Sequence, residues 1–371
     1  MLLFLVFWLA LSLVFSVVKV RGVDFKPFLL IVRASPERLE RALARLTSRR
    51  AKAWAVVLDA GVAVGFGMMA FSLYFLALNL IRRFTSPRSF VAVAPPIPGV
   101  LFPLEVAPHF IAALSVAVVI HELAHAIASR LAGVRIKSVG AALLAVILAA
   151  FVELDEEDVR RTGLSEKLRI FAAGSFANLA LFLLLLVAFT ALFQPGGVLI
   201  RHVEPSTPAY TAGITRDCVI KQLNDTSIAS ALDLHEFMEG TRPNQTVVVG
   251  FLDPAGSWRR VVVKTASHPL NSSKGFLGVL PVDFYELRMA ALPPSFLVHL
   301  HAFYAWLEII LFSLAVFNML PIAVADGGRM VQAAASELLK GGEGAARRLV
   351  AVLTALSACL VVSNIVLTLA P

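Results

Sequence analysis

Long apolar runs dominate the pattern of hydrophobic and polar positions along the chain. Six runs approach or exceed the roughly 20 residues that a helix needs to cross a bilayer, and they carry few charges. They lie at residues 1–18, 54–80, 108–132, 169–193, 296–320 and 348–369. The pattern therefore predicts an α-helical, multi-spanning membrane protein with about six spans.

Two of the apolar runs need a separate interpretation. Run 1–18 has no basic segment before it and no small-residue cleavage site before Lys19, so we expect a retained anchor rather than a signal peptide. A further run, residues 139–152, has 14 residues. That length is typical of a re-entrant or interfacial segment, and we predict a re-entrant segment there.

Between residues 197 and 281 the pattern changes to short alternating runs, which Gly, Pro and Asn interrupt. Such runs predict short strands, and one segment has the spacing of a short helix. The strands are expected at 198–203, 247–252 and 260–264, and the helix at 232–238. We therefore expect a small α+β domain inserted into the membrane protein. The expected parts are an N-terminal anchor with a basic segment (1–53), a first membrane-core part (54–193), the inserted domain (194–285) and a second membrane-core part (286–371).

Composition excludes a soluble protein. Hydrophobic residues make up 58% of the 371 residues and charged residues 16%, whereas charged residues make up about 25% of an average soluble domain. Mean hydropathy is +0.81. Of the two cysteines, Cys218 lies in the inserted domain and Cys359 in the last apolar run, so neither a disulfide framework nor a thiolate metal site is expected.

The basic residues predict the orientation. Segment 19–52 carries ten Lys and Arg against three Asp and Glu, which places it in the cytoplasm by the positive-inside rule. The inserted domain is then expected on the outside of a cell membrane. Three N-x-S/T sequons agree with that side, and all lie within the inserted domain: Asn224, Asn244 and Asn271.

Leu39, Leu43 and Leu46 recur at helical spacing among the arginines of residues 33–52. This spacing indicates either an amphipathic helix on an anionic lipid surface or a solvated basic linker. Nucleic acid is not an expected partner, because the charge lies beside the bilayer rather than on a folded domain.

The main chemical motif is His121-Glu122-Leu123-Ala124-His125, an HExxH inside run 108–132. On a helix, residues four apart share a face, so both imidazoles can bind one metal ion, with Glu122 beside the water of the site. Two His and one Glu in the middle of a membrane helix are costly unless they form a polar site. The alternative is a pair of buried histidines that neighbouring groups satisfy. His121 lies about 14 Å along the helix from Arg130, so the site is expected inside the bilayer towards the cytoplasmic face.

A hydrolytic zinc site usually has three protein ligands and one open position. The other acids in or near the apolar runs are Asp59, Glu308 and Asp326. Asp326 follows Pro321, which ends a helix, and precedes Gly327-Gly328, which allow the backbone to fold back. We expect Asp59 to cap a helix or form an ion pair, and Glu308 to pair with a neighbouring helix or line a water path.

Together these motifs resemble the site-2 protease family of intramembrane metalloproteases. HExxH is followed by N-x-x-P-x-x-x-x-D-G from Asn318, residues 171–178 resemble the family's AGPxxN segment, and "FVELDEED" from Phe151 resembles its acidic stretch. The resemblance covers about residues 108–330. Within the inserted domain, "EPSTPAYTAGITRDCVIKQLNDTSI" from Glu204 resembles a PDZ domain.

The resemblance implies a role for each matching residue. His121, His125 and Asp326 would bind one Zn²⁺ per chain, Glu122 would be the general base, and Asn178 and Asn318 would contact the substrate backbone or the oxyanion. The substrates would be transmembrane proteins, cut in regulated intramembrane proteolysis, and the membrane lipid would surround the site. The PDZ-like domain would bind a peptide or act as a spacer. The chain departs from the family pattern at Ser175 (usually Pro), Ala325 (commonly Leu) and Ala149–Ala150 (a Gly-rich turn).

Two other classes of function compete with a protease. A catalytically inactive, PDZ-bearing scaffold would tolerate the loss of Glu122, yet Glu122 is present. A metal-binding transporter would explain polar residues in spans, but it predicts repeated or broken half-helices, and the sequence shows no internal repeat.

Overall fold

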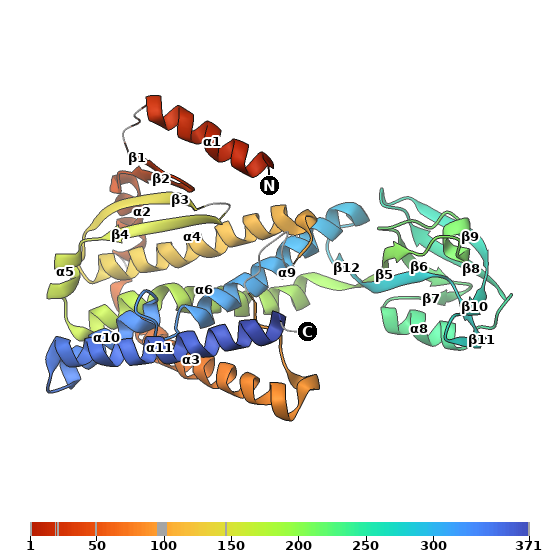
Figure 1. Ribbon diagram of the computed structural model, residues 1–371. Coiled ribbons are helices and arrows are strands. Elements are labelled where there is room, and N and C mark those ends of the chain that lie inside the picture. The colour runs from red at the N-terminus through yellow and green to blue at the C-terminus, as the bar shows by residue number, and fades with distance from the viewer. Residues whose placement is uncertain are drawn as a thin grey trace. The chain divides into compact units, whose positions relative to one another are not determined.

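The computed structural model describes residues 2–18, 20, 22–48, 50–94, 102–144 and 147–369 (Figure 1). The chain forms two compact units. Unit 1 contains residues 1–183 and 305–371, and unit 2 contains residues 184–304.

Within the described residues, five helices are long and apolar enough to cross a membrane. They are α3 (Ala51–Thr85), α4 (Ala107–Leu131), α6 (Leu164–Leu192), α9 (Pro294–Phe317) and α11 (Gly342–Leu369). These five helices coincide with five of the six predicted spans. The first apolar run forms α1 (Leu2–Val17), which has 16 residues and is shorter than a typical span. Two 3-10 turns, Pro87–Ser89 and Leu104–Val106, lie between α3 and α4.

Unit 1 also contains a four-stranded antiparallel sheet in the order β1-β2-β3-β4. Its strands are β1 (Val23–Lys26), β2 (Leu29–Ala34), β3 (Ile136–Leu144) and β4 (Ile147–Leu154). The apolar run 139–152 forms the hairpin β3–β4 and so reverses direction, as a re-entrant segment does; residues 145 and 146 lie outside the described residues. Its depth in a bilayer stays a prediction. Ala149 and Ala150 pair with Ala142 and Ala141 inside β4, not in a turn.

The basic segment forms α2 (Glu37–Thr47), which packs on α4 and β3. Leu39 and Leu43 contact a cluster that contains Ala126 and Ile136. The predicted amphipathic helix is confirmed, but its Leu39 and Leu43 pack against the protein, whereas Leu46 is 52% exposed. Its position on a lipid surface stays a prediction. The alternative, a solvated basic linker, does not agree with a helix that packs on α4 and β3.

Small residues bring the membrane helices of unit 1 close together. Gly61 and Gly65 of α3 form a GxxxG pair, and a Cβ at these positions would lie 3.1 Å from Phe176 and 3.3 Å from Met330. Helix α6 continues through Ser175, where a proline would remove one backbone donor. Helix α10 (Asp326–Leu338) packs on α11, and the short α5 (Glu156–Arg161) follows β4.

Towards the other end of α3, buried amides connect it to α11. Asn79 Nδ2 donates to Asn364 Oδ1 over 2.8 Å, and Asn364 Nδ2 donates to the Leu76 carbonyl over 3.0 Å. Asn79 also exchanges two hydrogen bonds with the Val91 backbone. Each buried amide therefore has partners inside the protein, as apolar surroundings require.

Unit 2 is built on a sheet in the order β12-β5-β6-β8-β9, with β7 beside β6 and a separate pair β10–β11. The predicted strands and helix are confirmed as β5, β8, β9 and α8. The largest cluster of buried side chains includes Ile200, Ile220, Val249 and Phe251, and a separate cluster contains Leu199, Val219 and Phe284. The elements are β5 (Phe193–Val203), α7 (Pro208–Thr211), β6 (Val219–Leu223), β7 (Thr226–Ser227), α8 (Ala231–Glu239), β8 (Thr246–Leu252), β9 (Trp258–Lys264), β10 (Ala266–His268), β11 (Asn271–Phe276) and β12 (Val279–Leu287).

Candidate metal centre

Helix α4 brings His121 and His125 to one face, one turn apart, and both side chains are buried. Asp326 is the first residue of α10 and is buried too. The turn before Asp326 packs against two glycines that directly follow it, Gly327 and Gly328. A Cβ at Gly327 would lie 2.2 Å from the Met319 carbonyl oxygen, and one at Gly328 would lie 2.0 Å from the Ile322 carbonyl oxygen. Neither glycine has a positive φ, so the close approach of the preceding backbone, rather than the expected conformational freedom, requires a glycine at each position.

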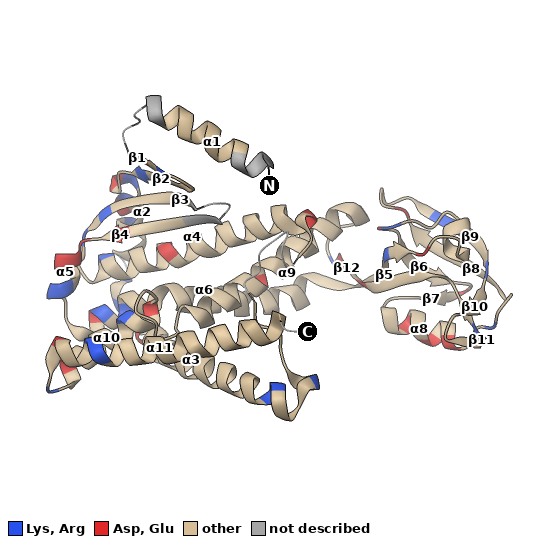
Figure 2. Cartoon of the chain, viewed as in Figure 1, with Lys and Arg blue, Asp and Glu red and all other residues tan. Residues whose placement is uncertain are grey.

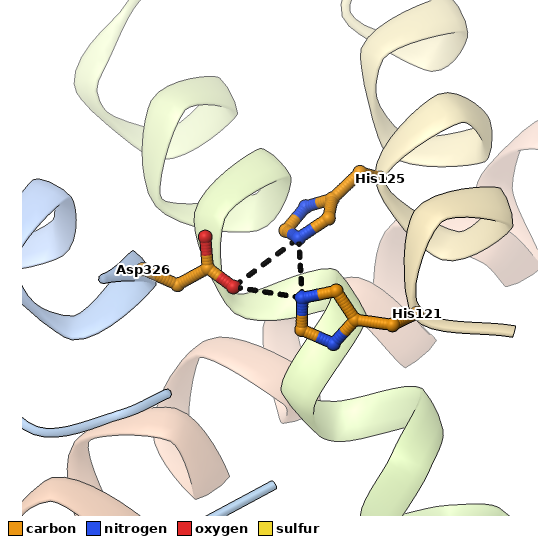
Figure 3. A group of neighbouring side chains, drawn as sticks. All are labelled: His121, His125 and Asp326. Carbon is orange, nitrogen blue, oxygen red and sulfur yellow. Dashed lines mark hydrogen bonds and ion pairs between the residues drawn. The ribbon is translucent and has the colours of Figure 1, made fainter. Parts of the chain in front are cut away.

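The three side chains point at one another and form a nearly equilateral triangle of donor atoms (Figure 3). The two imidazole Nε2 atoms lie 3.1 Å apart. Asp326 Oδ2 lies 3.1 Å from His121 Nε2 and 3.2 Å from His125 Nε2. Residues 201 positions apart in the chain thus meet at one point. It is the one group of this kind among the described residues.

This donor set fits zinc. With bonds of about 2.0 Å and tetrahedral angles, two ligand atoms lie about 3.3 Å apart, close to each side of the triangle. Two imidazoles and one carboxylate are also ligands that zinc prefers. Three protein ligands leave one tetrahedral position for a water or a substrate, which is the pattern of a catalytic rather than a structural site.

Helix α6 fixes the orientation of His125. The Nδ1 of His125 lies 2.7 Å from the Ile170 carbonyl oxygen, which must accept a proton from Nδ1. That hydrogen bond leaves the Nε2 lone pair for a metal. Gly174 lies one turn further along α6, and a Cβ there would come within 2.5 Å of His125 Nε2 and 2.6 Å of His121 Nε2. A glycine is therefore required for α6 to lie this close to both imidazoles.

The two asparagines differ in their surroundings. Asn178 is fully buried, and its Nδ2 lies 3.4 Å from His121 Nδ1, while its Oδ1 has no hydrogen-bond partner among the described residues. Rotation of the amide by half a turn brings Oδ1 beside His121 Nδ1. When His121 Nε2 binds a metal ion, Nδ1 carries the proton, and Oδ1 then accepts a hydrogen bond from it. Asn318 is only partly buried, and its Nδ2 lies 3.4 Å from His121 Nε2.

Glu122 lies beside the triangle and is not one of its corners. Its Oε2 accepts a hydrogen bond of 2.8 Å from the backbone N–H of Val152 in β4. Among the described residues, the other carboxylate oxygen has no such partner. Helix α4 and the hairpin therefore fix the carboxylate together, and one oxygen stays available for proton transfer.

A cavity of about 830 Å³ contains this chemistry. His121, Glu122, His125, Asn318 and Asp326 line it, and its remaining walls come from β4, α5, α6, α10 and α11. Asn178 does not line it. Asp59 and Glu308, the two other acids singled out in the sequence, do not line this cavity. Asp59 pairs with Arg169 over 2.6 and 2.8 Å, which confirms the expected ion pair. Glu308 is partly buried in α9 without an ion pair among the described residues.

Comparison with known proteins identifies the family. The model of peptidase family M50 matches residues 109–363, which is more than half of the chain. The chain belongs to peptidase family M50, the site-2 protease family. The match confirms the family predicted from the motifs, and it agrees with an integral membrane protein that resembles the site-2 metalloproteases.

Other similar proteins give less information about this chain than the family match does. An uncharacterized protein of Methanocaldococcus jannaschii is 29% identical over 290 residues, which cover 75% of this chain and 70% of the relative. The crystal structure of the PDZ domain of the SdrC-like protein from Listeria monocytogenes matches 23% of this chain and 87% of that domain, with 14% identity and a TM-score of 0.21. A TM-score this low does not support a conclusion about the fold of unit 2.

Proposed function

We propose that the chain is a zinc endopeptidase that hydrolyses transmembrane proteins within the bilayer, near the cytoplasmic side. The observation that carries this proposal is the triangle of His121, His125 and Asp326, with side lengths of 3.1 to 3.2 Å, next to Glu122 in one cavity. Family membership supports the same class of enzyme.

The proposed chemistry is the hydrolysis of a peptide bond. His121, His125 and Asp326 would hold a zinc ion, and the bound ion would supply Lewis acidity to polarise the scissile carbonyl and to make water more acidic. The carboxylate of Glu122 accepts a proton from the attacking water as the bond between water oxygen and carbonyl carbon forms. Glu122 then delivers that proton to the amide nitrogen as the carbon–nitrogen bond breaks. The hydrogen bond from Val152 holds the carboxylate in place during both transfers.

We assign different roles to the two asparagines. Asn318 lines the cavity and can donate a hydrogen bond to the substrate backbone or the oxyanion. Asn178 is fully buried behind His121, so its geometry favours a positioning role over the substrate contact expected from the sequence. Its amide would hold His121 in the tautomer and orientation that metal binding needs.

The substrate must be extended at the scissile bond, because a helix keeps its carbonyls in internal hydrogen bonds. β4 forms one edge of the sheet, and its Val152 N–H points away from β3 towards Glu122. Ala150 and Leu148 follow at intervals of two and direct their backbone groups the same way. We propose that an unwound substrate segment pairs with this edge, which would align its carbonyl with the site.

The remaining assignments rest on sequence. The positive-inside rule favours a cytoplasmic location for the sheet and for α2, α5 and α10, with residues 194–285 as a domain on the outside of a cell membrane. That domain would bind an extended peptide or restrict the size of substrates. Cleavage would belong to regulated intramembrane proteolysis, as the family resemblance implies.

Zinc content and activity together test the proposal. Purified protein should contain about one zinc ion per chain and cut a transmembrane substrate. His125→Ala should lose most of the zinc, because two ligands hold the ion poorly. Glu122→Gln should keep the zinc and lose cleavage. If Glu122→Gln loses as much zinc as His125→Ala, the roles assigned to these residues are wrong.

A further inference from the structure

Ser175 of α6 is one of the positions at which the chain departs from the family pattern, and its hydroxyl has unusual surroundings. The residue is fully buried, and its Oγ has no hydrogen-bond partner among the described residues. By contrast, the buried serines Ser72 and Ser129 on α3 and α4 each donate to a backbone carbonyl of the preceding turn, over 2.9 and 2.7 Å. A buried hydroxyl without a partner is costly, so Ser175 should have one in the working protein.

A second buried polar atom without a described partner lies three residues further along α6, and it is Asn178 Oδ1. Residues three apart on a helix are neighbours, with about 5 to 6 Å between their Cβ atoms, which one hydrogen bond between a hydroxyl and an amide can span. Charged residues are confined to the beginning of α6, before Ile170 (Figure 2). Both Ser175 and Asn178 are fully buried and neither lines the catalytic cavity, so each needs a partner from the protein interior.

Rotation of the Asn178 amide by half a turn makes the two groups partners. In the rotated orientation, Oδ1 accepts the proton of His121 Nδ1, and Nδ2 takes the former place of Oδ1. The amide then directs a donor to a place where the protein supplied none. The Ser175 hydroxyl oxygen can accept from this N–H, and its own hydrogen can donate to a carbonyl of the preceding turn. His121, Asn178 and Ser175 then form one chain of hydrogen bonds behind the metal site.

We infer that Ser175 is a positioning residue that holds the Asn178 amide in the orientation that zinc binding requires. The inference rests on the proposed function, because it needs His121 to bind the metal through Nε2. Ser175 lines no part of the catalytic cavity and acts through Asn178 on His121. A buried N–H without an acceptor is tolerated less well than a carbonyl oxygen without a donor. Loss of the hydroxyl should therefore penalise the zinc-bound orientation of the amide more than the opposite one.

Zinc affinity tests the contact, measured on full-length protein in nanodiscs with chelator-buffered zinc. Ser175→Ala should lower the affinity about three- to tenfold, which is less than the loss expected for Asn178→Ala because Ser175 is one step further from the ion. Ser357→Ala is the matched control. Ser357 is also fully buried with an unpartnered Oγ among the described residues, but it lies on α11 and does not line the cavity. Its replacement should leave zinc affinity unchanged.

A double-mutant cycle separates this role from a general effect on helix packing. In an Asn178→Ala background, Ser175→Ala should change zinc affinity by less than about twofold, because the contact is already lost. At saturating zinc, Ser175→Ala should also keep the KM of the parent protein for a transmembrane substrate, since Ser175 does not contact substrate. A role in packing alone would lower zinc affinity equally in both backgrounds.

Two results overturn the inference. One is an equal loss of zinc affinity in the parent and Asn178→Ala backgrounds, because Ser175 then does not act through Asn178. The other is an unchanged zinc affinity of Ser175→Ala with a raised free energy of unfolding, as expected for Ser357→Ala, because the hydroxyl then has no partner to lose. The predicted coupling in a protein that cuts no transmembrane substrate supports the inference and contradicts the proposed function alone.

Discussion

At the scale of single residues, the contacts behind the ligands matter as much as the ligands. The Ile170 carbonyl directs the lone pair of His125 Nε2 towards the centre of the triangle. The Asn178 amide lies behind His121 in the same way, and no apolar group in that position would fix its tautomer. Such partners contribute to metal affinity because they orient the ring and raise its basicity.

Replacing Asn178 by Ala should therefore lower zinc affinity by about 10- to 100-fold, the usual cost of losing such a partner. The measurement is zinc retention in a series of chelator concentrations. Asn318→Ala is the comparison, because Asn318 faces the cavity: it should keep more zinc and lose cleavage rate. If Asn178→Ala binds zinc like the parent protein and only raises the KM for substrate, Asn178 contacts substrate instead.

At the scale of elements, the site depends on how closely α6 approaches α4. Gly174 is the point of approach, where a Cβ would lie 2.5 Å from His125 Nε2. Real Cβ atoms do not come so near, so any side chain there must push the helices apart or move an imidazole. The matched position is Gly67 of α3, where a Cβ would meet nothing within 4 Å.

Gly174→Ala should cost at least tenfold in zinc affinity, since ligands displaced by fractions of an ångström no longer share one ion. Gly67→Ala should leave zinc binding intact and raise the free energy of unfolding by up to about 1 kcal/mol, the helix preference of Ala over Gly. Zinc titration and thermal unfolding of both variants measure this contrast. Equal zinc affinity of the two variants would show that the approach at Gly174 is not tight.

Local patterns predicted the membrane helices and the first two ligands, because helical spacing alone brings His121 and His125 together. Asp326 was one of three candidate acids in the sequence, and the family resemblance was needed to assign it as the third ligand, since no local pattern connects it with α4. The hairpin β1–β2 was missed. Its strands have four and six residues, and β2 pairs with β3, more than a hundred residues away, which leaves no local signal. The same distance explains why the protein contacts that bury Leu39 and Leu43 were not predicted.

At the scale of the whole molecule, five long helices that each cross the membrane place successive connections on alternate sides of it. The segment before α3 then shares a side with β3, β4, α5 and α10, and this holds whether or not α1 crosses the bilayer. Lys and Arg are concentrated in these connections, with ten in residues 19–52 and seven in residues 130–169. The charge rule predicts that these connections lie in the cytoplasm.

Cysteine labelling in intact cells tests this orientation. In a background with Cys218 and Cys359 replaced, a cysteine at exposed Arg45 should resist an impermeant maleimide until the membrane is opened. A cysteine at exposed Ser257, in the β8–β9 connection, should react at once. Both proteins should react fully after permeabilisation, which serves as the control. Reaction of both cysteines in intact cells would overturn the charge-based orientation.

The central claim is that a zinc site inside the bilayer hydrolyses transmembrane helices. Cleavage of matched substrates tests this claim most directly. One substrate has a stable helix across the scissile region, two carry Gly or Pro a few residues from the bond, and a fourth is the same segment as a soluble unfolded peptide. Gly and Pro lower helix stability by about 1 and 3 kcal/mol, so the broken helices should be cut several-fold faster, with little change in binding. The Glu122→Gln protein should cut none of them. If the soluble peptide is cut as fast as the membrane substrates, and stable and broken helices are cut alike, the account of a buried site is contradicted.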